Sequence, residues 1–207
     1  MQLHVMLRTC PRPVDYLQAT RNSLHAAGFE GYRLCVDLFC QRSSNGNFRT
    51  SLSRLVAESD HDDWLLTCED DIQVATGLHA WLLTTLPTLE SQFGPIGVAS
   101  VYTAESVPKP NAGWNIMLAS TKCLGACAIA MTREAAIDFL KVGSKAEHKT
   151  RSGESLLEWC YAVGRHWLFH SPSYVQHIGE QSAFHPFGIN PDRRAGDFVA
   201  SVGFSRV

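Results

Sequence analysis

The apolar residues of this chain recur in two patterns, short continuous runs and longer stretches with helical spacing. In the second pattern Val14, Leu17, Leu24 and Ala27 share one helical face, and Gly28 ends the stretch. The patterns predict strands at residues 3–9, 32–39, 62–74, 96–103, 124–132 and 166–178, and helices at 14–27, 48–59, 78–91, 133–142 and 153–164. Strands that alternate with helices favour an α/β fold with a mainly parallel, Rossmann-like central sheet flanked by helices.

Three segments show neither pattern. Residues 43–47 (SSNGN) have the composition of a turn, and the tail after residue 178 is irregular. Residues 104–122 contain two prolines and no period, which predicts a long loop. Loops of that length inside a compact domain are usually functional or mobile. The 207 residues suit one domain, so we expect a single domain over residues 1–207.

Composition narrows the classes of protein that the chain can be. The formal net charge of -2 gives no global field that would attract DNA or an anionic membrane. Seven cysteines without a C-x-x-C pair predict free thiols in a reducing compartment. No signal peptide is evident, and no segment approaches the roughly 20 apolar residues that span a bilayer. We therefore expect a cytoplasmic monomer or small homo-oligomer.

An acidic triplet, Glu69-Asp70-Asp71, follows the apolar run WLLTC. In open α/β sheets the ligand crevice lies outside the carboxyl ends of the strands. Adjacent carboxylates repel one another, and Mg²⁺ or Mn²⁺ neutralises them while keeping free positions for phosphate oxygens. That arrangement suits a nucleoside diphosphate leaving group. The alternative is a solvated acidic turn, or carboxylates that complement a helix N-terminus.

Four segments resemble the GT-A glycosyltransferases, in that family's order and over residues 3 to about 184. The triplet resembles the D-x-D (or E-D-D) motif. Thr9, Arg12, Tyr16-Leu17, Thr20 and Ser23-Leu24 resemble the family's nucleotide-binding start. Residues 124–126, followed by 132–136 (TREAA), resemble its segment under the donor sugar. Residues 172–182 (PSYVQHIGEQS) are similar to the P-S-L-x-Q-H-x-G-x-x-S run of N-acetylglucosaminyltransferase IV-type enzymes and of small phage and bacterial transferases.

The resemblance implies a nucleotide-sugar donor, a UDP-sugar first, and a Mn²⁺ or Mg²⁺ cofactor. Asp71 would contact the metal, and His177 would supply a second ligand, since a neutral imidazole suits Mn²⁺. The alternative for His177 is a core histidine bonded to backbone. Glu69 would lie near the ribose or the metal's water shell, and Asp70 beside the sugar, where it would take part in catalysis.

The same resemblance assigns roles around the donor and the attacking hydroxyl. If the enzyme inverts configuration, it needs a base, and Glu154 matches the family's position at a helix start. Glu158 lies one turn on as the other choice, and either could simply complement the helix dipole. The residues expected around the nucleotide and the sugar are Thr9, Asp37, Arg12, Asn47, Gly125 and Ala126. Arg8 and Asp37 could equally form a structural pair.

The second half of the chain is expected to bind the acceptor. With residues 1–103 as the nucleotide-sugar and metal half, residues 104–207 would bind the acceptor. Tyr102, Trp114, Asn115 and Lys122 suit a sugar ring or a base face. The basic residues Lys145, His148, Lys149, Arg151, Arg193, Arg194 and Arg206 could contact nucleic acid phosphates or could be solvated surface charge.

We therefore expect a metal-dependent hexosyl- or pentosyltransferase. The preferred acceptor is 5-hydroxymethyl-pyrimidine DNA of the phage type, and a glycan or lipopolysaccharide is the alternative. A phosphohydrolase or nucleotidyltransferase could use the same acids, but MLRTCPRP lacks the glycine-rich phosphate loop of sugar-phosphate nucleotidyltransferases. Asp71, His177 and Glu154 also argue against a silent sugar-nucleotide-binding module.

Overall fold

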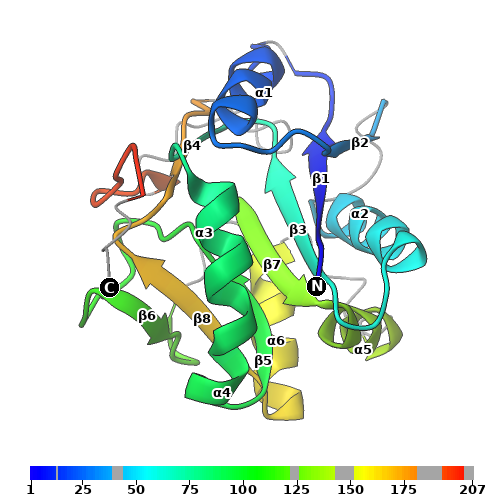
Figure 1. The fold of residues 1–207 in the computed structure, drawn as a ribbon, viewed down its shortest axis with the longest axis vertical. Coiled ribbons are helices and arrows are strands. Elements are labelled where there is room, and N and C mark those ends of the chain that lie inside the picture. Colours follow the sequence, from blue (N-terminus) through cyan, green and yellow to red (C-terminus); the bar gives the residue numbers. More distant parts are fainter. Residues whose placement is uncertain (13, 39–43, 122–125, 143–151, 181–192, 203–207) are drawn as a thin grey trace.

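The computed structural model describes residues 1–12, 14–38, 44–121, 126–142, 152–180 and 193–202 (Figure 1). Its strands are β1 (Leu3–Thr9), β2 (Arg33–Val36), β3 (Trp64–Glu69), β4 (Ile72–Val74), β5 (Ile96–Ser100), β6 (Gly113–Ile116), β7 (Ala128–Thr132), β8 (His166–Ser171) and β9 (Val175–His177). Its helices are α1 (Leu17–Ala26), α2 (Ser44–Glu58), α3 (Leu78–Thr85), α4 (Leu89–Phe93), α5 (Arg133–Val142) and α6 (Ser152–Val163), with a 3₁₀ turn at Leu86–Thr88.

Within these residues, seven strands form the central sheet in the order β2-β1-β3-β7-β5-β8-β6. β1 pairs in parallel with β2 and β3, and β5 pairs in parallel with β8. β7 runs antiparallel between β3 and β5, and β6 is an antiparallel edge strand. Most strands therefore point the same way, which confirms the predicted α/β class with a mainly parallel sheet.

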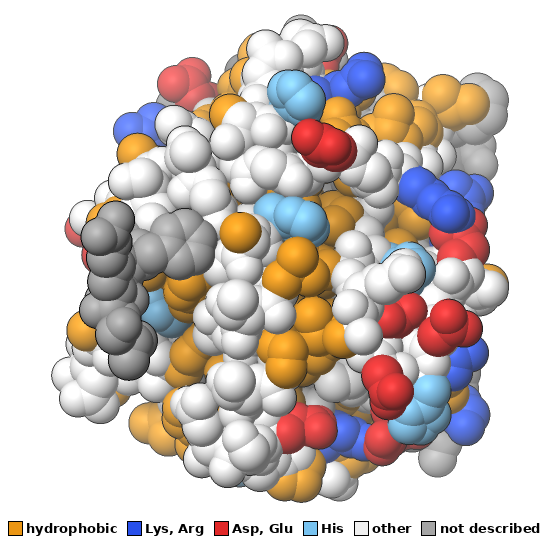
Figure 2. Space-filling view, in the orientation of Figure 1, with side chains coloured by type: hydrophobic (Ala, Val, Ile, Leu, Met, Phe, Trp, Pro, Cys, Tyr) orange, Lys and Arg blue, Asp and Glu red, His pale blue; other side chains and the backbone are white. Residues whose placement is uncertain are grey.

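The central strands are almost wholly buried because helices lie on both sides of them. Every residue of β5 is buried, and so are the first five of β3. α2, α5 and α6 pack against one another on one face, while α3 crosses the other face (Figure 1). Strands buried on both sides read as continuous apolar runs. On the α3 side, hydrophobic side chains are visible in the middle of the surface, and charged side chains gather at its rim (Figure 2).

The structure differs from the predicted elements at several breaks. Helix 78–91 is interrupted at Pro87, which lacks the N–H that a continuing helix needs. The predicted strand 166–178 divides into β8 and β9 around Pro172, which cannot donate to a strand ladder. The predicted turn at 43–47 is helical from Ser44 onward. The predicted loop 104–122 contains β6, whose partner β8 lies more than fifty residues further on.

A second, two-stranded sheet departs from the predicted strand 62–74. The chain leaves the central sheet after Glu69, and β4 pairs with β9 instead, with Ile72 opposite His177. A C-terminal strap (residues 193–202) then covers this small sheet. Backbone bonds join Thr76 N to Ala200 O and Val202 N to Thr76 O. These bonds hold the end of the described chain against the segment that follows β4.

Among the described residues, none of the helices combines the length and the apolar character needed to cross a bilayer.

Candidate active site

The acidic triplet is held in place by hydroxyl groups of α1. The Thr20 hydroxyl is wholly buried, accepts a hydrogen bond from Ile72 N at 3.0 Å and lies 2.8 Å from the carbonyl oxygen of Asp70, to which it donates. One turn further, Ser23 accepts a hydrogen bond from Val74 N at 2.6 Å. These two side chains belong to the opening motif, so part of that motif fixes the backbone around the acids.

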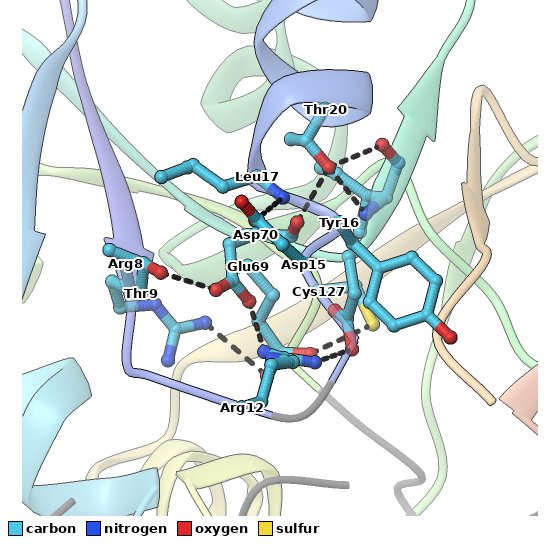
Figure 3. A network of polar contacts seen from close by, with 12 residues as sticks. Arg8, Thr9, Arg12, Asp15, Tyr16, Leu17, Thr20, Glu69, Asp70 and Cys127 are labelled. Atoms are coloured by element: carbon cyan, nitrogen blue, oxygen red, sulfur yellow. Dashed lines mark hydrogen bonds and ion pairs between the residues drawn. The ribbon is translucent and has the colours of Figure 1, made fainter. Parts of the chain in front are cut away.

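Asp70 lies at the carboxyl edge between β1 and β3 (Figure 3). It accepts hydrogen bonds from the Thr9 hydroxyl and from the Arg12 guanidinium. Burial nevertheless raises the pKa of Asp70 to about 6, because these partners only partly compensate for lost solvation. Although burial alone would lower it, the pKa of Arg12 is raised by Asp71 and Asp70. Thr9, Arg12 and Asp70 therefore form one connected group.

Asp71 meets His177 because β4 and β9 pair. The amide of Ile178 donates to the carbonyl oxygen of Asp71 at 2.8 Å, and His177 Nε2 lies 3.1 Å from Asp71 Oδ2. The Arg12 guanidinium contacts the same Oδ2 at 2.7 Å. Burial acts to raise the pKa of Asp71, but His177 and Arg12 outweigh it, so the pKa falls below its ordinary value. The carboxylate is thus held ionised beside an imidazole.

Gly179 leaves room for that carboxylate. A Cβ atom at this position would stand 2.9 Å from Asp71 Cγ and 3.0 Å from its Cβ, with Oδ2 closer still. Real Cβ atoms essentially never come that near to another heavy atom. The glycine of the Q-H-x-G sequence therefore has a steric reason, which is close approach to the acidic side chain.

Glu69 lies between two arginines from distant parts of the chain. Arg193 Nη2 is 2.7 Å from Glu69 Oε2, and Arg8 Nη2 is 3.6 Å from Oε1. Arg8 also donates to the carbonyl oxygen of Ala126 at 2.6 Å. Burial acts to raise the pKa of Glu69, but the positive charges of Arg193 and Arg8 outweigh burial, so the pKa is lowered. The Cys127 thiol lies 3.4 Å from Glu69 Oε2, and burial together with Glu69 raises its pKa well above the ordinary value.

The residues present fit a divalent cation. In the part of the chain that the structure describes, Asp71 Oδ1 and His177 Nε2 are buried and have no hydrogen-bond partner. Buried polar atoms are normally paired, and a bound cation would supply the partner that these two neighbouring atoms lack. A carboxylate oxygen and an imidazole nitrogen are both donors that Mn²⁺ accepts.

The other predicted site residues lie at different distances from this cluster. Asp37 is buried, and its amide donates to the carbonyl oxygen of Thr9 at 2.9 Å, beside the expected nucleotide pocket. Asn47 is buried on α2, with Cys35 Sγ 3.5 Å from its Oδ1. Ala126 reaches the cluster through Arg8, whereas Gly125 lies outside the described residues. Glu154 is exposed in the first turn of α6, and its role as base stays a prediction.

The aromatic residues expected at the acceptor take part in packing. Trp114 stacks on Trp81 with ring centroids 5.8 Å apart and meets His170 edge-on. Tyr102 is buried, and its hydroxyl donates to the carbonyl oxygen of Arg193. Asn115 is also buried, with its amide bonded to the carbonyl oxygens of residues 111 and 113. Lys122 and the basic residues at 145–151 and 206 lie outside the described residues.

Sequence reasoning did not place Arg193, Arg8, Cys127 or Gly179 in this cluster. Gly179 carried a signal, since it belongs to the Q-H-x-G sequence, and Cys127 directly follows Ala126. Arg193 is one of the basic residues expected to contact nucleic acid phosphates or solvent, and nothing in its local sequence indicates a partner 124 positions away. Only the strap, which folds back over β4 and β9, explains how it reaches Glu69.

No protein-family model matches the sequence, and no curated protein matches it either. Among solved structures, the fold is similar to that of a crystal structure described as a glycosyltransferase involved in the glycosylation of the major capsid of PBCV-1. The TM-score is 0.51, with 12% sequence identity over 82% of this chain and 83% of that chain. At this identity the similarity concerns the fold alone. The chain therefore shares its α/β architecture with a glycosyltransferase.

Proposed function

We propose that the protein is a metal-dependent glycosyltransferase that moves a sugar from a nucleotide-sugar, a UDP-sugar first, to an acceptor hydroxyl. The observation that carries the proposal is the buried Asp71–His177 pair at the carboxyl edge of the sheet. Each of these side chains keeps an atom without a hydrogen-bond partner among the described residues. The fold shared with a glycosyltransferase supports the same reaction class, although fold alone does not establish activity.

Asp71 and His177 would hold Mn²⁺ or Mg²⁺ in this proposal. The cation would neutralise the charge that develops on the diphosphate as the sugar leaves. Arg12 already lies against Asp71 and Asp70, so its guanidinium is close enough to hold a phosphate oxygen once a donor enters. Thr9 and Asp37 stand side by side at the ends of β1 and β2, where a nucleotide base would lie.

Asp70 and Glu154 would act on the sugar and on the acceptor. Asp70 would lie beside the donor sugar and accept hydrogen bonds from its hydroxyl groups. Glu154 would take the proton of the acceptor hydroxyl as that oxygen attacks the anomeric carbon, which gives an inverted product. Glu154 is exposed at the start of α6.

For the acceptor we keep 5-hydroxymethyl-pyrimidine DNA as the first candidate, on the resemblance to small phage transferases. A glycan is the second candidate, and two observations favour it. The similar structure concerns the glycosylation of a viral capsid. Arg193, one of the basic residues that could have contacted DNA, is instead largely buried against Glu69.

The test is a donor screen with Mn²⁺. The protein is incubated with UDP-, GDP-, ADP- and CMP-sugars, with and without hydroxymethylcytosine DNA, and nucleotide release and product mass are measured. We expect release that requires metal and falls at least about a hundredfold in Asp71→Ala, and that is unchanged in Asp62→Ala, whose side chain is 88% exposed.

The outcomes separate the alternatives. A hexose or pentose mass on the DNA supports the first acceptor, and metal-dependent release without DNA transfer moves the acceptor to glycans. Metal-dependent hydrolysis of phosphate esters that do not carry a sugar would favour the phosphohydrolase alternative. Absence of metal binding, donor binding and release together would contradict the proposed reaction class.

A further inference from the structure

A thiol stands among the oxygen and nitrogen donors of the candidate site. Cys127 Sγ, a carboxylate oxygen of Glu69 and a ring nitrogen of His177 all lie within 4.8 Å of one another. We propose that these three side chains form a second cation site, selective for a thiophilic divalent ion with zinc first, which shares His177 with the proposed Mn²⁺ or Mg²⁺ site. The binding itself does not depend on transferase activity.

The spacing of the donor atoms is close to what zinc requires. Zinc bonds of about 2.0–2.3 Å place tetrahedral ligand atoms roughly 3.3–3.8 Å apart. Cys127 Sγ and Glu69 Oε2 already meet that spacing at 3.4 Å, and the whole set needs only a small closure. Cys127 is fully buried, and His177 is 5% exposed. Among the described residues His177 Nε2 has no hydrogen-bond partner of good geometry, and its close polar contact is Asp71 Oδ2 at 3.1 Å, which zinc would have to replace.

The donor types favour zinc over the harder ions. Mg²⁺ and Mn²⁺ prefer carboxylate, carbonyl and water oxygens, and a thiolate offers them little. One sulfur, one imidazole nitrogen and one carboxylate oxygen are donors that zinc accepts, with a fourth position left open. The two proposed sites therefore share an imidazole but differ in the ion that they select.

Arg193 competes for the same place. Its Nη2 lies 2.7 Å from Glu69 Oε2 and 3.7 Å from Cys127 Sγ, so a guanidinium now stands where the cation would bind. Zinc must displace it, and the thiol proton passes to solvent as the zinc–sulfur bond forms. We therefore expect removal of the guanidinium charge to raise zinc affinity.

The test uses Co²⁺ as a spectroscopic probe and Zn²⁺ as the competitor on the 207-residue chain. We expect a near-ultraviolet sulfur-to-cobalt charge-transfer band that stoichiometric Zn²⁺ abolishes. Cys127→Ser should remove the band and weaken Zn²⁺ binding by more than the roughly tenfold that loss of an outer-shell partner costs. Cys160→Ser is the matched control, because Cys160 is also buried but packs at the opposite edge of the sheet, against Gly97 near the start of β5.

Absence of the band in the wild-type protein, or its survival in Cys127→Ser, would overturn the proposal. If Cys127→Ser fails to fold, as circular dichroism would reveal, Arg193→Gln keeps the proposal testable, since its Zn²⁺ affinity must then exceed that of the wild type. Unchanged or weaker binding there would also count against it. Mn²⁺-dependent transfer without the cobalt band rejects only this site, and the band without any transfer rejects only the proposed function.

Discussion

At the scale of single residues, the candidate site depends on a missing side chain as much as on the charged ones. Gly179 lies so close to Asp71 that any Cβ there would collide with the carboxylate. The carboxylate is also held by Arg12 and approached by His177, so it has little room to move aside. A methyl group at this position should therefore act on the proposed cation site while leaving the distant core alone.

We expect Gly179→Ala to weaken Mn²⁺ binding, measured with UDP present, by at least about tenfold, as for other changes that misplace a metal ligand. Gly31→Ala is the control, because its Cβ would meet no atom within 4 Å. Isothermal titration calorimetry on both variants provides the measurement. Equal Mn²⁺ affinity in the two variants would show that Asp71 does not hold the ion.

At the scale of elements, helix α1 and the small β4–β9 sheet position the acids. After the chain leaves the central sheet, the amide of Ile72 donates to the Thr20 hydroxyl instead of to a neighbouring strand of that sheet. This exchange explains why a single predicted strand at 62–74 becomes two strands in two sheets. A side-chain hydroxyl that competes for backbone bonds is invisible to an analysis of apolar periodicity.

Thr20→Val removes that hydroxyl at nearly constant volume. The buried amide of Ile72 then loses its acceptor, which should cost about 1–3 kcal/mol in the free energy of unfolding. Urea unfolding measures the change. Thr84→Val, at an exposed site on α3, should stay within about 0.5 kcal/mol of the wild type. A loss in Thr20→Val no larger than in this control would mean that the hydroxyl is dispensable.

Asp63 joins the amino ends of β1 and β3 by a similar device. Its carboxylate accepts hydrogen bonds from Gln2 N at 2.6 Å and from Asp60 N at 2.9 Å, and it lies 2.9 Å from His4 Nε2. Burial acts to raise the pKa of Asp63, but these partners outweigh it and hold the pKa below its ordinary value of 3.8. The folded state therefore binds fewer protons than the unfolded chain at pH values between the lowered pKa and about 3.8.

The stability that Asp63 contributes should be complete above pH 3.8 and lost as the pH falls through its lowered folded-state value. We expect Asp63→Ala to cost about 2 kcal/mol at pH 7 and less at pH 3, because protonation of the unfolded wild-type chain below pH 3.8 already reduces what the carboxylate contributes. Chemical unfolding at the two pH values gives the comparison. The control is Asp62→Ala, at a neighbouring exposed side chain, which should leave the free energy of unfolding unchanged at both pH values. A pH-independent cost would exclude the charged carboxylate as its source.

At the scale of the whole molecule, the strap closes the site by returning the chain to the sheet. Gln176 of β9 holds the strap through two hydrogen bonds to Ala195. Its Nε2 donates to the carbonyl oxygen of Ala195 at 3.0 Å, and its Oε1 accepts from the amide of Ala195 at 2.8 Å. Val199 N adds a bond to the carbonyl oxygen of Ser173. Arg193 begins this segment, so its contact with Glu69 depends on how firmly the strap is held.

We expect Gln176→Leu to loosen the strap and leave the central sheet intact. Hydrogen exchange should quicken at the amides of Thr76, Val199 and Val202, while those of β3 and β5 stay protected. Gln73→Leu is the control, since Gln73 faces Gln176 across the small sheet but is exposed. Unchanged exchange in the strap would show that its backbone bonds suffice without the side chain.

The sequence allowed prediction of what local patterns encode. The alternation of apolar runs gave the fold class, and the Q-H-x-G sequence indicated that His177 belongs with the acids. The pairing of β6 with β8 and of Glu69 with Arg193 joins positions far apart along the chain. Such contacts depend on how the whole chain packs, so no window of neighbouring residues can carry them.

The arginines around the triplet have a consequence for the order in which ligands load. The described site gathers carboxylates from Glu69, Asp70 and Asp71 and guanidinium groups from Arg8, Arg12 and Arg193, and their formal charges cancel. A doubly charged cation that enters alone leaves a buried positive surplus, which is unfavourable. A nucleotide-sugar brings one negative charge on each of its two phosphates and removes that surplus. Cation and donor should therefore bind as a neutral pair, each tightening the other by the same factor.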